Sequence, residues 1–328
     1  MHLNAHGLSV LVLDGGEHAV PTVVSLLGDG ASVTLRTDTL CAALEDLVQR
    51  GRLGWTDDDA DERSFDLVVR RVPSPSADTS RTGAGRVTLV GAGPGDPGLV
   101  TVAGREALET ADVVVADRLA PWEAIAWAPA HVEVVDVSKI PFGRSTSQDE
   151  INRLLVEHAL QGRHVVRLKG GDSYVFGRGF EEVQACAAAG VSTRVIPGVT
   201  SSVAGPELAG VPVTHRGVVQ GFTVVSGHVP PGDERSSVDW PSLATSNTTL
   251  VLLMAVKYLP EITACLIDSG LAPDTPAAIL VEGSLPDQEA HFSTLGDVAT
   301  MARDKGIRPP AIVVVGQVAG GHLTMPAS

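Results

Sequence analysis

VVRLKGGDSYVFGRGFEE, residues 165–182, is the stretch that decides the fold of this chain. It reads as a short apolar strand, a loop broken by glycines, and a helix that starts at Glu181 and Glu182. Gly170 and Gly171 can adopt backbone angles that other residues avoid, and they let a ligand approach the main chain closely. Ligands of open α/β sheets bind beyond the carboxyl ends of the strands, so this loop is predicted to lie in a ligand site.

The same loop carries three charged side chains, those of Asp172, Arg178 and Glu181. An ordinary strand-to-helix turn is the alternative interpretation. Two glycine pairs and a carboxylate beside Gly170-Gly171, all within about a dozen residues, favour the ligand site.

Size and composition are those of a folded protein with two or three domains: 328 residues, 44% hydrophobic and 19% charged. No apolar run reaches the roughly 18 residues that a membrane span needs. The first residues, 1–4, lack the basic and apolar regions of a secretory signal, so a cytoplasmic location is expected. Cys41, Cys186 and Cys265 show no CxxC spacing, which predicts neither a disulfide framework nor a metal site.

The formal net charge of −15 excludes a protein that binds nucleic acid through a broad basic face. It also means that an anionic small molecule would be repelled at long range. Such a ligand would need a local basic pocket, because arginines and lysines inside a cleft outweigh a screened distant field.

The first 75 residues predict a truncated Rossmann-like β-α-β domain. The expected strands and the one expected helix are 8–13, 31–35 and 65–69, with the helix at 19–27. Asp14 stands where the dinucleotide-binding fingerprint needs a glycine, and its carboxylate would repel a pyrophosphate. NAD binding by this segment is therefore not expected.

Residues 71–85, rich in Pro, Ser, Gly and Thr, predict a linker that we place at 76–85. Two α/β subdomains are expected after it, at 86–204 and 205–320, with a tail at 321–328. The loop 91–98 formally satisfies GxGxxG. Its two prolines lack the N–H groups that a phosphate cradle uses, so it better suits a ligand without phosphates.

Asp117 follows the apolar strand 113–116 directly, a position well suited to chemistry. A turn or helix-capping aspartate is the alternative, and the residues alone favour that alternative. His158 has helical spacing with apolar neighbours, which is more typical of a packing residue than of a ligand.

With these pieces in place, residues 86–318 resemble the uroporphyrinogen-III C-methyltransferases of the tetrapyrrole methylase family. The matching motifs occur in the order of the family: VGAGPGDP (90–97), DRL (117–119), RLKGGD (167–172), FGRGxEE (176–182), PGVTS (197–201) and AGVPVTHR (209–216).

The resemblance implies two α/β domains with an active-site cleft between them, a homodimer, and S-adenosyl-methionine as methyl donor. It implies methylation of uroporphyrinogen III at C2 and C7, through precorrin-1, to precorrin-2, for siroheme or cobalamin biosynthesis, with no metal. The residues expected to contact the donor are Pro94, Gly170, Gly171, Asp172, Val175, Thr200, Ser201, Met254 and Gly283.

For the chemistry, the resemblance implies Asp117 as proton acceptor and Lys139 as proton donor. Arg178, Glu181, Arg216 and Met254 match residues near the tetrapyrrole. Arg178 is a rival to Asp117 as base, which an arginine could be only if its pKa were strongly perturbed.

Four positions depart from the family pattern: Ser138 before Lys139, Ser173 after Gly-Gly-Asp, Phe180 before Glu181, and Ala255 after Met254. Phe180 places a bulky ring where the family has glycine, and that ring could stack on the macrocycle.

The N-terminal segment resembles the start of the precorrin-2 dehydrogenase part of siroheme synthase, without its fingerprint glycine. We expect no dehydrogenase or chelatase activity from it, and a structural or dimer-packing role. Two alternatives to the assigned function stay open: a methylase of a later corrin precursor, and a non-catalytic protein that binds tetrapyrrole or S-adenosyl-methionine.

Overall fold

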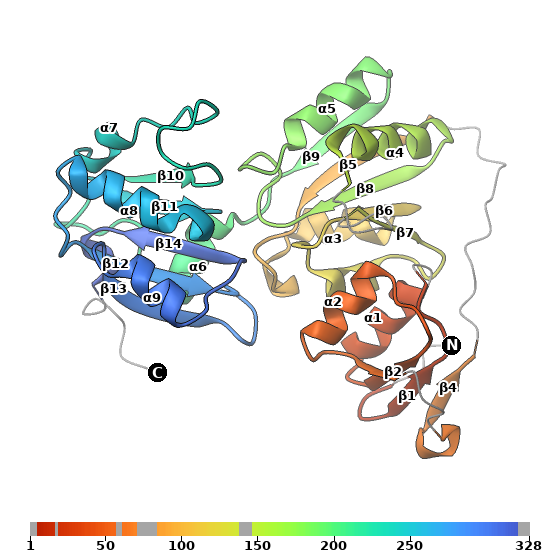
Figure 1. Cartoon of the computed structure of the whole chain (residues 1–328). Coiled ribbons are helices and arrows are strands. Elements are labelled where there is room, and N and C mark those ends of the chain that lie inside the picture. The colour runs from red at the N-terminus through yellow and green to blue at the C-terminus, as the bar shows by residue number, and fades with distance from the viewer. Residues whose placement is uncertain (1–4, 17–18, 57–60, 71–83, 138–145, 321–328) are drawn as a thin grey trace. The chain divides into compact units, whose positions relative to one another are not determined.

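The computed structural model describes residues 5–16, 19–56, 61–70, 84–137 and 146–320. The chain divides into two compact units, residues 1–199 and 200–328. The first unit contains two parallel sheets and the second contains one mixed sheet (Figure 1). The α/β architecture predicted from the sequence is thus confirmed, whereas the predicted cleft between domains stays a prediction.

The N-terminal sheet has the strand order β3-β2-β1-β4, and all its strands run parallel. Its elements are β1 (Ser9–Val12), α1 (Val20–Gly28), β2 (Ser32–Arg36), α2 (Ala42–Gln49), β3 (Gly54–Thr56) and β4 (Leu67–Val69), with a short 3-10 turn at Glu62–Ser64. Pro21 is accommodated in the first turn of α1, where its missing N–H costs nothing. The sequence reading omitted α2 and β3.

The N-terminal sheet shares its hydrophobic core with the next part of the chain. Helix α1 packs against the 3-10 segment η4 (Trp122–Trp127), whose Trp122 and Ile125 side chains are buried. One continuous apolar cluster runs from β1 through η4 to Val114 and Ala116. Arg52 also forms an ion pair with Glu123 of η4, with 3.2 Å between Nη1 and Oε1.

The second sheet of unit 1 has the order β7-β6-β8-β5-β9 and is again fully parallel. Its elements are β5 (Arg86–Gly91), α3 (Val102–Glu109), β6 (Val113–Ala116), β7 (Glu133–Asp136), α4 (Gln148–Leu160), β8 (His164–Lys169), α5 (Gly179–Ala188) and β9 (Ser192–Ile196), with the 3-10 turn η3 at Pro97–Leu99. Because every strand runs the same way, the loops that follow them meet at one edge of the sheet.

Local signals start the helices of this sheet. The predicted capping box at α4 is present: the Ser147 hydroxyl accepts a hydrogen bond from the N–H of Glu150 at 3.2 Å. Thr101 caps α3 in the same way through the N–H of Gly104. Helix α5 begins at Gly179, two residues before the predicted start at Glu181, because Arg178 adopts a left-handed conformation and occupies the capping position.

Unit 2 has a five-stranded sheet of order β10-β11-β14-β12-β13. Its elements are α6 (Ser201–Leu208), β10 (Phe222–Ser226), α7 (Trp240–Ala244), β11 (Thr249–Leu253), α8 (Leu259–Asp268), β12 (Pro276–Val281), β13 (Glu289–Thr294), α9 (Val298–Asp304) and β14 (Ala311–Val315), with 3-10 turns at Val256–Tyr258 and Gln317–Ala319. Strand β14 runs antiparallel to both β11 and β12, so β10, β11 and β12 all end at the same edge.

The sequence reading missed α6, α7 and β13. Helix α6 contains Gly205 and Pro206, residues that normally interrupt a helix, and the structure holds Pro206 inside it. Strand β13 contains no fully buried residue and no apolar stripe to reveal it.

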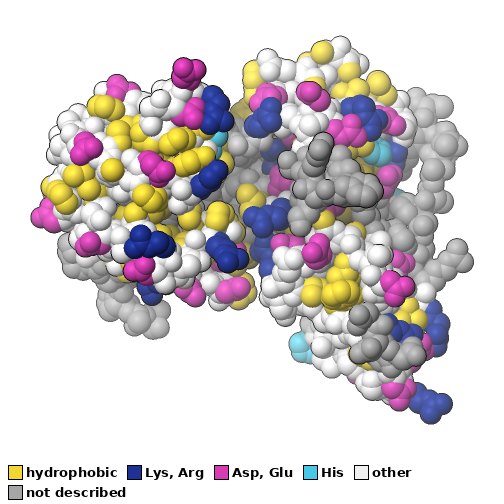
Figure 2. Space-filling model, in the orientation of Figure 1, with side chains coloured by type: hydrophobic (Ala, Val, Ile, Leu, Met, Phe, Trp, Pro, Cys, Tyr) yellow, Lys and Arg dark blue, Asp and Glu magenta, His cyan; other side chains and the backbone are white. Residues whose placement is uncertain are grey.

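Most of the predicted linker lies outside the described residues, and so does the tail. Within the part of the chain that the structure describes, no helix is long and apolar enough to cross a membrane. Figure 2 shows acidic, basic and apolar side chains interspersed over one face of the molecule, without a continuous basic surface there. The three cysteines are free thiols: Cys186 is buried, whereas Cys41 and Cys265 are half-buried.

Candidate functional site

Three loops at the carboxyl edge of the second sheet are in direct contact. The loop after β5 and the loop after β8 form a two-residue bridge, in which the N–H of Gly171 donates to the carbonyl of Gly93 at 2.6 Å. The loop after β9 joins them through the N–H of Gly198, which donates to the Asp172 carboxylate at 3.0 Å. The predicted donor residues Pro94 and Gly170 to Asp172 therefore lie on one connected set of loops.

The glycines in these loops are needed for close packing of main chain on main chain. A Cβ on Gly170 would lie 2.5 Å from the carbonyl oxygen of Leu119, and one on Gly198 would lie 2.3 Å from that of Gly171. Gly171 also has a φ of +66°, which other residues rarely adopt. The sequence reading expected close approach of a ligand here, and the structure shows close approach of neighbouring loops.

Asp172 fixes the geometry of the loop after β8. One carboxylate oxygen accepts from the N–H of Tyr174 at 2.8 Å and the other from the N–H of Gly198 at 3.0 Å. Both bonds are to the charged acceptor and are correspondingly strong. Asp172 thus holds the loops after β8 and β9 together, and its main-chain groups stay at the edge of the sheet.

Asp117 lies at the end of β6 and its side chain is about one-third exposed. Its Oδ1 accepts from the N–H of Leu119 at 3.2 Å, as a turn aspartate would, and its Oδ2 accepts from Nη2 of Arg167 at 3.2 Å. Asp117 is therefore a turn-forming aspartate, as the residues alone favour, and its second oxygen also takes part in an ion pair. One oxygen fixes the turn and the other is paired with an arginine.

Arg167 belongs to a buried ion cluster behind Asp117. The side chains of Arg167, Lys169 and Glu182 are 3%, 4% and 0% exposed. Oε1 of Glu182 accepts from Nε of Arg167 at 3.1 Å and from Nζ of Lys169 at 3.0 Å. Burial lowers the pKa of Lys169, the neighbouring Arg167 lowers it further, and the Glu182 carboxylate opposes both effects.

Arg178 and Glu181 form a bidentate pair at the start of α5. Nε and Nη2 of Arg178 donate to the two Glu181 oxygens at 2.8 and 2.7 Å. Both side chains are about half exposed, so the pair is open to solvent. Hydrogen bonding and charge from Glu181 raise the pKa of Arg178, and Arg178 lowers that of Glu181. This shift opposes the use of Arg178 as a base.

Apolar side chains lie close to this pair in the sequence, on the loop after β8 and in the first turn of α5. Tyr174 and Phe180 meet edge to face, with 5.9 Å between ring centroids. Tyr174, Val175, Phe176 and Phe180 are all exposed. Exposed aromatics beside an exposed arginine suit a ligand with both a flat apolar body and anionic groups.

Unit 2 holds the remaining predicted donor residues. Thr200 caps α6, its hydroxyl accepting from the N–H of Ser202 at 3.4 Å, and Ser201 is the first residue of that helix. Gly283 lies beside α6: a Cβ on it would be 3.4 Å from Cα of Gly205. Met254 follows β11 at the same sheet edge as Gly283, and it is 48% exposed.

Strained backbone conformations are concentrated in these predicted site loops. In the described ranges, six residues other than glycine have positive φ angles: Phe176, Arg178, Asn247, Met254, Glu282 and Ser284. All except Asn247 lie in loops that follow β8, β11 or β12. Such conformations cost roughly 1–3 kcal/mol each and cluster at functional sites. Their positions therefore favour a functional role for the loop after β8 in unit 1 and for the loops after β11 and β12 in unit 2.

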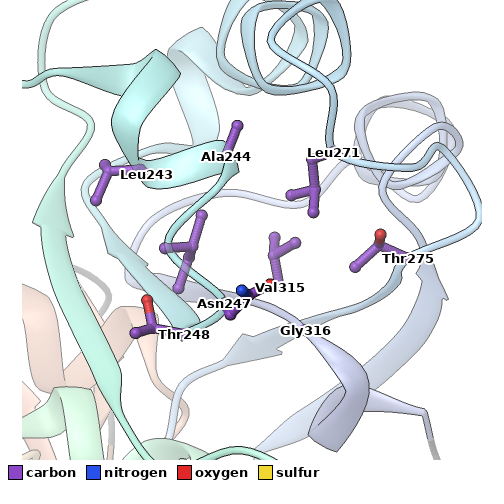
Figure 3. Close-up of a pocket in the computed structure, with 9 residues that line it drawn as sticks. Leu243, Ala244, Asn247, Thr248, Leu271, Thr275, Val315 and Gly316 are labelled. Atoms are coloured by element: carbon purple, nitrogen blue, oxygen red, sulfur yellow. The ribbon is translucent and has the colours of Figure 1, made fainter.

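Arg216 and Lys139 complete the predicted set. Arg216 is exposed in the turn closed by the bridge between His215 and Val219. Lys139 lies outside the described residues. Unit 2 also contains a small cavity of about 50 Å³, lined by Asn247, Thr248 and Thr275 among apolar residues (Figure 3). It lies at the amino end of β11, away from Met254, and so does not belong to the predicted site.

Sequence reasoning missed Arg167, Lys169 and Glu182. The available signal was two cations in a strand, β8, that reads as apolar and is buried along its whole length. A cation in a strand buried on both faces needs a buried partner. Among the described residues, no three His, Cys, Asp or Glu side chains are grouped as metal ligands would be.

Comparison with known proteins gives the chemistry of the relatives. The family model of tetrapyrrole (corrin/porphyrin) methylases matches residues 86–299. The S-adenosyl-L-methionine-dependent uroporphyrinogen III methyltransferase of Methanosarcina barkeri is 43% identical over 238 residues, covering 73% of this chain and 93% of that protein. A siroheme synthase of Gluconacetobacter diazotrophicus is 37% identical over 291 residues, 87% of this chain and 61% of that protein. This match is longer than residues 86–328 and extends into the N-terminal segment.

A solved structure with the same fold contains a relevant ligand. The uroporphyrin-III C-methyltransferase of Thermus thermophilus, complexed with S-adenosyl-homocysteine, matches with a TM-score of 0.60 and 41% identity. The match covers 71% of this chain and 98% of that chain.

Proposed function

The chain belongs to the tetrapyrrole methylase family, and from that premise we propose that it methylates uroporphyrinogen III with S-adenosyl-methionine. The products are precorrin-1 and, after methylation at C2 and C7, precorrin-2. Four relatives that are named for this activity are 39–44% identical to the chain, and the chain matches 93–98% of the length of each.

The observation that carries the proposal is the set of strained loop residues at the sheet edges. Five of the six left-handed non-glycine residues in the described ranges fall in loops assigned to donor or tetrapyrrole by the family motifs. Backbone strain is retained where the surrounding structure enforces it, typically at ligand clamps and active sites. Elsewhere in the part of the chain that the structure describes, Asn247 is the sixth such residue.

The donor residues fit a ligand held mostly by main-chain groups. The loops carrying Pro94, Gly170 and Gly171 are fixed by the Asp172 carboxylate and by glycine contacts, so their remaining main-chain groups are preorganised. Half-exposed Met254 and exposed Val175 offer apolar contact. S-adenosyl-methionine supplies an activated methyl group, and the protein has mainly to align it with the acceptor carbon.

The tetrapyrrole carboxylates need local cations in a protein with a net charge of −15. Arg178 and Arg216 are exposed and charged, and a guanidinium pairs with a carboxylate through two parallel hydrogen bonds. Glu181 holds Arg178 in place. The exposed rings of Tyr174 and Phe180 suit the apolar body of the substrate.

Each methyl transfer releases a proton from the tetrapyrrole, and Asp117 is the group proposed to accept it. Its carboxylate is partly exposed and oriented by Leu119 and Arg167. Arg178 is a poor rival, because its pKa is raised by Glu181. Lys139 keeps the role of proton donor as a proposal from the family motifs.

Anaerobic incubation of the protein with S-adenosyl-methionine and uroporphyrinogen III tests the function. We expect S-adenosyl-homocysteine and a tetrapyrrole with the mass of two added methyl groups. Binding of S-adenosyl-homocysteine without any methylated product would support a non-catalytic binding protein instead. Methylation of a later corrin precursor but not of uroporphyrinogen III would assign the other alternative.

Arg178→Ala tests the substrate end of the site. The variant should lose turnover at least a hundredfold while S-adenosyl-homocysteine binding, measured by calorimetry, stays within about twofold, since one anchoring guanidinium is lost. Arg153→Ala, on the exposed face of α4, is the matched control and should leave turnover unchanged. Normal turnover by Arg178→Ala would remove this residue from the site.

Cytoplasmic location and a homodimer remain part of the proposal, as does supply of siroheme or cobalamin biosynthesis. Siroheme synthases among the relatives support the siroheme branch. Size-exclusion chromatography with light scattering would test the dimer, with a monomer as the contradicting result.

A further inference from the structure

We propose that Glu182 is a positioning residue for the proton-accepting end of the site, and that it acts on Asp117 through Arg167. This inference rests on the proposed methyltransferase function and adds a residue that the family motifs did not assign. Three observations carry it: the burial of Glu182, the unbroken path from Glu182 to Asp117, and the sharing of one oxygen by two cations.

Glu182 is buried and is therefore not an ordinary solvent-exposed glutamate of a helix surface. The residue is fully buried in the first turn of α5, and fully buried glutamates are rare unless they are paired. Its Oε1 accepts all of its hydrogen bonds, including a long one of 3.4 Å from Gln148, and its Oε2 has no partner among the described residues.

The path to Asp117 is continuous. Nε of Arg167 donates to Glu182, Nη1 donates to the carbonyls of Val115 and Leu168 at 3.3 and 3.0 Å, and Nη2 donates to Oδ2 of Asp117. Each nitrogen of this guanidinium therefore has a partner in a fixed direction. The plane of the guanidinium is rigid, so fixing Nε at Glu182 also fixes the direction in which Nη2 meets Asp117.

The four charges of the cluster balance. Arg167 and Lys169 are the cations, and Glu182 and Asp117 are the anions. Glu182 is the deepest of the four and Asp117 the one that reaches solvent, at 30% side-chain exposure. Without Glu182, both cations would have only Asp117 as a carboxylate partner among the described residues. Arg167 would then lose its inner anchor, and Asp117 would lose its fixed orientation.

A purely structural role makes a different prediction from a positioning role. If Glu182 only neutralises buried charge, activity should follow the amount of folded protein. If Glu182 aims Arg167 at Asp117, the rate of methyl transfer should fall even in fully folded protein, and donor binding should be spared. The loops that carry the donor residues contact each other through Gly93, Gly171 and Asp172, without using Glu182.

The test uses the full chain with Glu182→Gln, which preserves size and removes the charge. We expect kcat for methyl transfer to uroporphyrinogen III to fall at least tenfold, with the KM for S-adenosyl-methionine and S-adenosyl-homocysteine binding within about twofold. Glu157→Gln is the matched control, because it breaks a glutamate–arginine pair on exposed α4 and should leave kcat unchanged.

A double variant, Glu182→Gln with Lys169→Met, covers the case in which the single variant folds poorly. It removes one buried charge of each sign, so its thermal unfolding should return toward that of the parent. We expect its kcat to stay at least tenfold low, because Arg167 still lacks the anchor. Recovery of kcat together with stability, or a normal kcat in a folded single variant, would overturn the inference. Absence of methylation by the parent would instead remove the proposed function, and the inference with it.

Discussion

Asp14 and Asp117 stand in corresponding places, each just after a strand of a parallel sheet in unit 1. Oδ1 of Asp14 accepts from the N–H of Gly16 at 3.0 Å, and Oδ1 of Asp117 accepts from that of Leu119 at 3.2 Å. Behind Asp117 lies the buried Arg167, itself held by Glu182. Equal turn geometry therefore does not make equal sites, and the buried cluster distinguishes the two.

The turn that carries Asp14 also packs closely against another segment of the chain. A Cβ on Gly15 would lie 2.1 Å from the carbonyl oxygen of Thr39 and 2.7 Å from Cγ2 of Thr37. The N–H of Cys41 donates to the carbonyl of Gly15 at 2.8 Å. The glycine turn of the N-terminal sheet therefore packs closely against the segment after β2. The same strand-turn pattern here serves packing.

Neutralising the two aspartates gives the largest expected difference. Asp117→Asn should lower kcat by about a hundredfold to ten-thousandfold, the usual contribution of a general base, and should leave S-adenosyl-homocysteine binding unchanged. Asp14→Asn should leave kcat at the parent value. Equal rates for both variants would show that the buried cluster confers no function on Asp117.

The next largest expected difference is in stability, between two glutamates that each pair with two cations. Glu62 and Glu182 each pair with two cations, Arg36 and Arg70 for the first, Arg167 and Lys169 for the second. Replacing Glu182 with Gln should lower the free energy of unfolding by about 3 kcal/mol, because two buried cations lose their partner. Replacing Glu62 with Gln should leave the urea midpoint nearly unchanged, because that carboxylate is only partly buried and solvent screens its ion pairs. Equal shifts would contradict the contrast in burial.

Acid should weaken the second sheet before the N-terminal one. Burial lowers the pKa of His164 in the folded chain. When the pH decreases below the ordinary value of 6.5, the unfolded chain therefore binds a proton more readily than the folded chain does. The free energy of unfolding should then decrease as the pH decreases. The pKa of Glu62 is lowered by Arg36, and that of Asp66 by the N–H of Ser9, so their stabilisation persists above their ordinary values of 4.5 and 3.8.

Urea unfolding of the parent and of His164→Gln at pH 7.5 and 5.5 measures this effect. The parent should lose more stability than the variant over this interval. A loss of the same size in both proteins would assign the pH dependence to other groups.

The smallest expected difference concerns thiol reactivity. Burial raises the pKa of Cys186 to about 11, whereas Cys41 in the N-terminal segment is half-buried. Only the thiolate reacts with iodoacetamide, so Cys186 should be labelled more slowly than Cys41 at pH 8. Mass spectrometry of timed digests measures both rates. Faster labelling of Cys186 would show that the core around α5 opens more readily than the N-terminal segment.

Much of the fold could be predicted from the sequence, for physical reasons that also explain the gaps. Apolar runs bounded by turns located strands such as β6 and β11, and the capping box located α4. Helix α6 was hidden by the Gly205-Pro206 pair, which tertiary packing overrides. Strand β13 was hidden because it pairs along an exposed edge and buries little apolar surface.

Only those site residues that belong to recognisable family motifs could be predicted from the sequence. The family motifs singled out Asp117, Arg178 and the glycine loops, whereas the residue types alone are also those of ordinary turns. Glu182 was taken as part of a helix start, since glutamates in the first turn are normally explained by the helix dipole. Its burial depends on β8 and α5 lying side by side, and a linear sequence does not show that contact.

The packing of α1 on η4 has a consequence for any shortened form of this protein. Trp122 and Ile125 are covered partly by residues of the N-terminal sheet, and they follow Asp117 by only a few positions. Removing residues 1–75 would strip that cover and expose an apolar surface close to the turn that carries Asp117. The N-terminal segment thus covers an apolar surface of the second sheet's half of unit 1, and a shortened chain would need polar side chains at those positions.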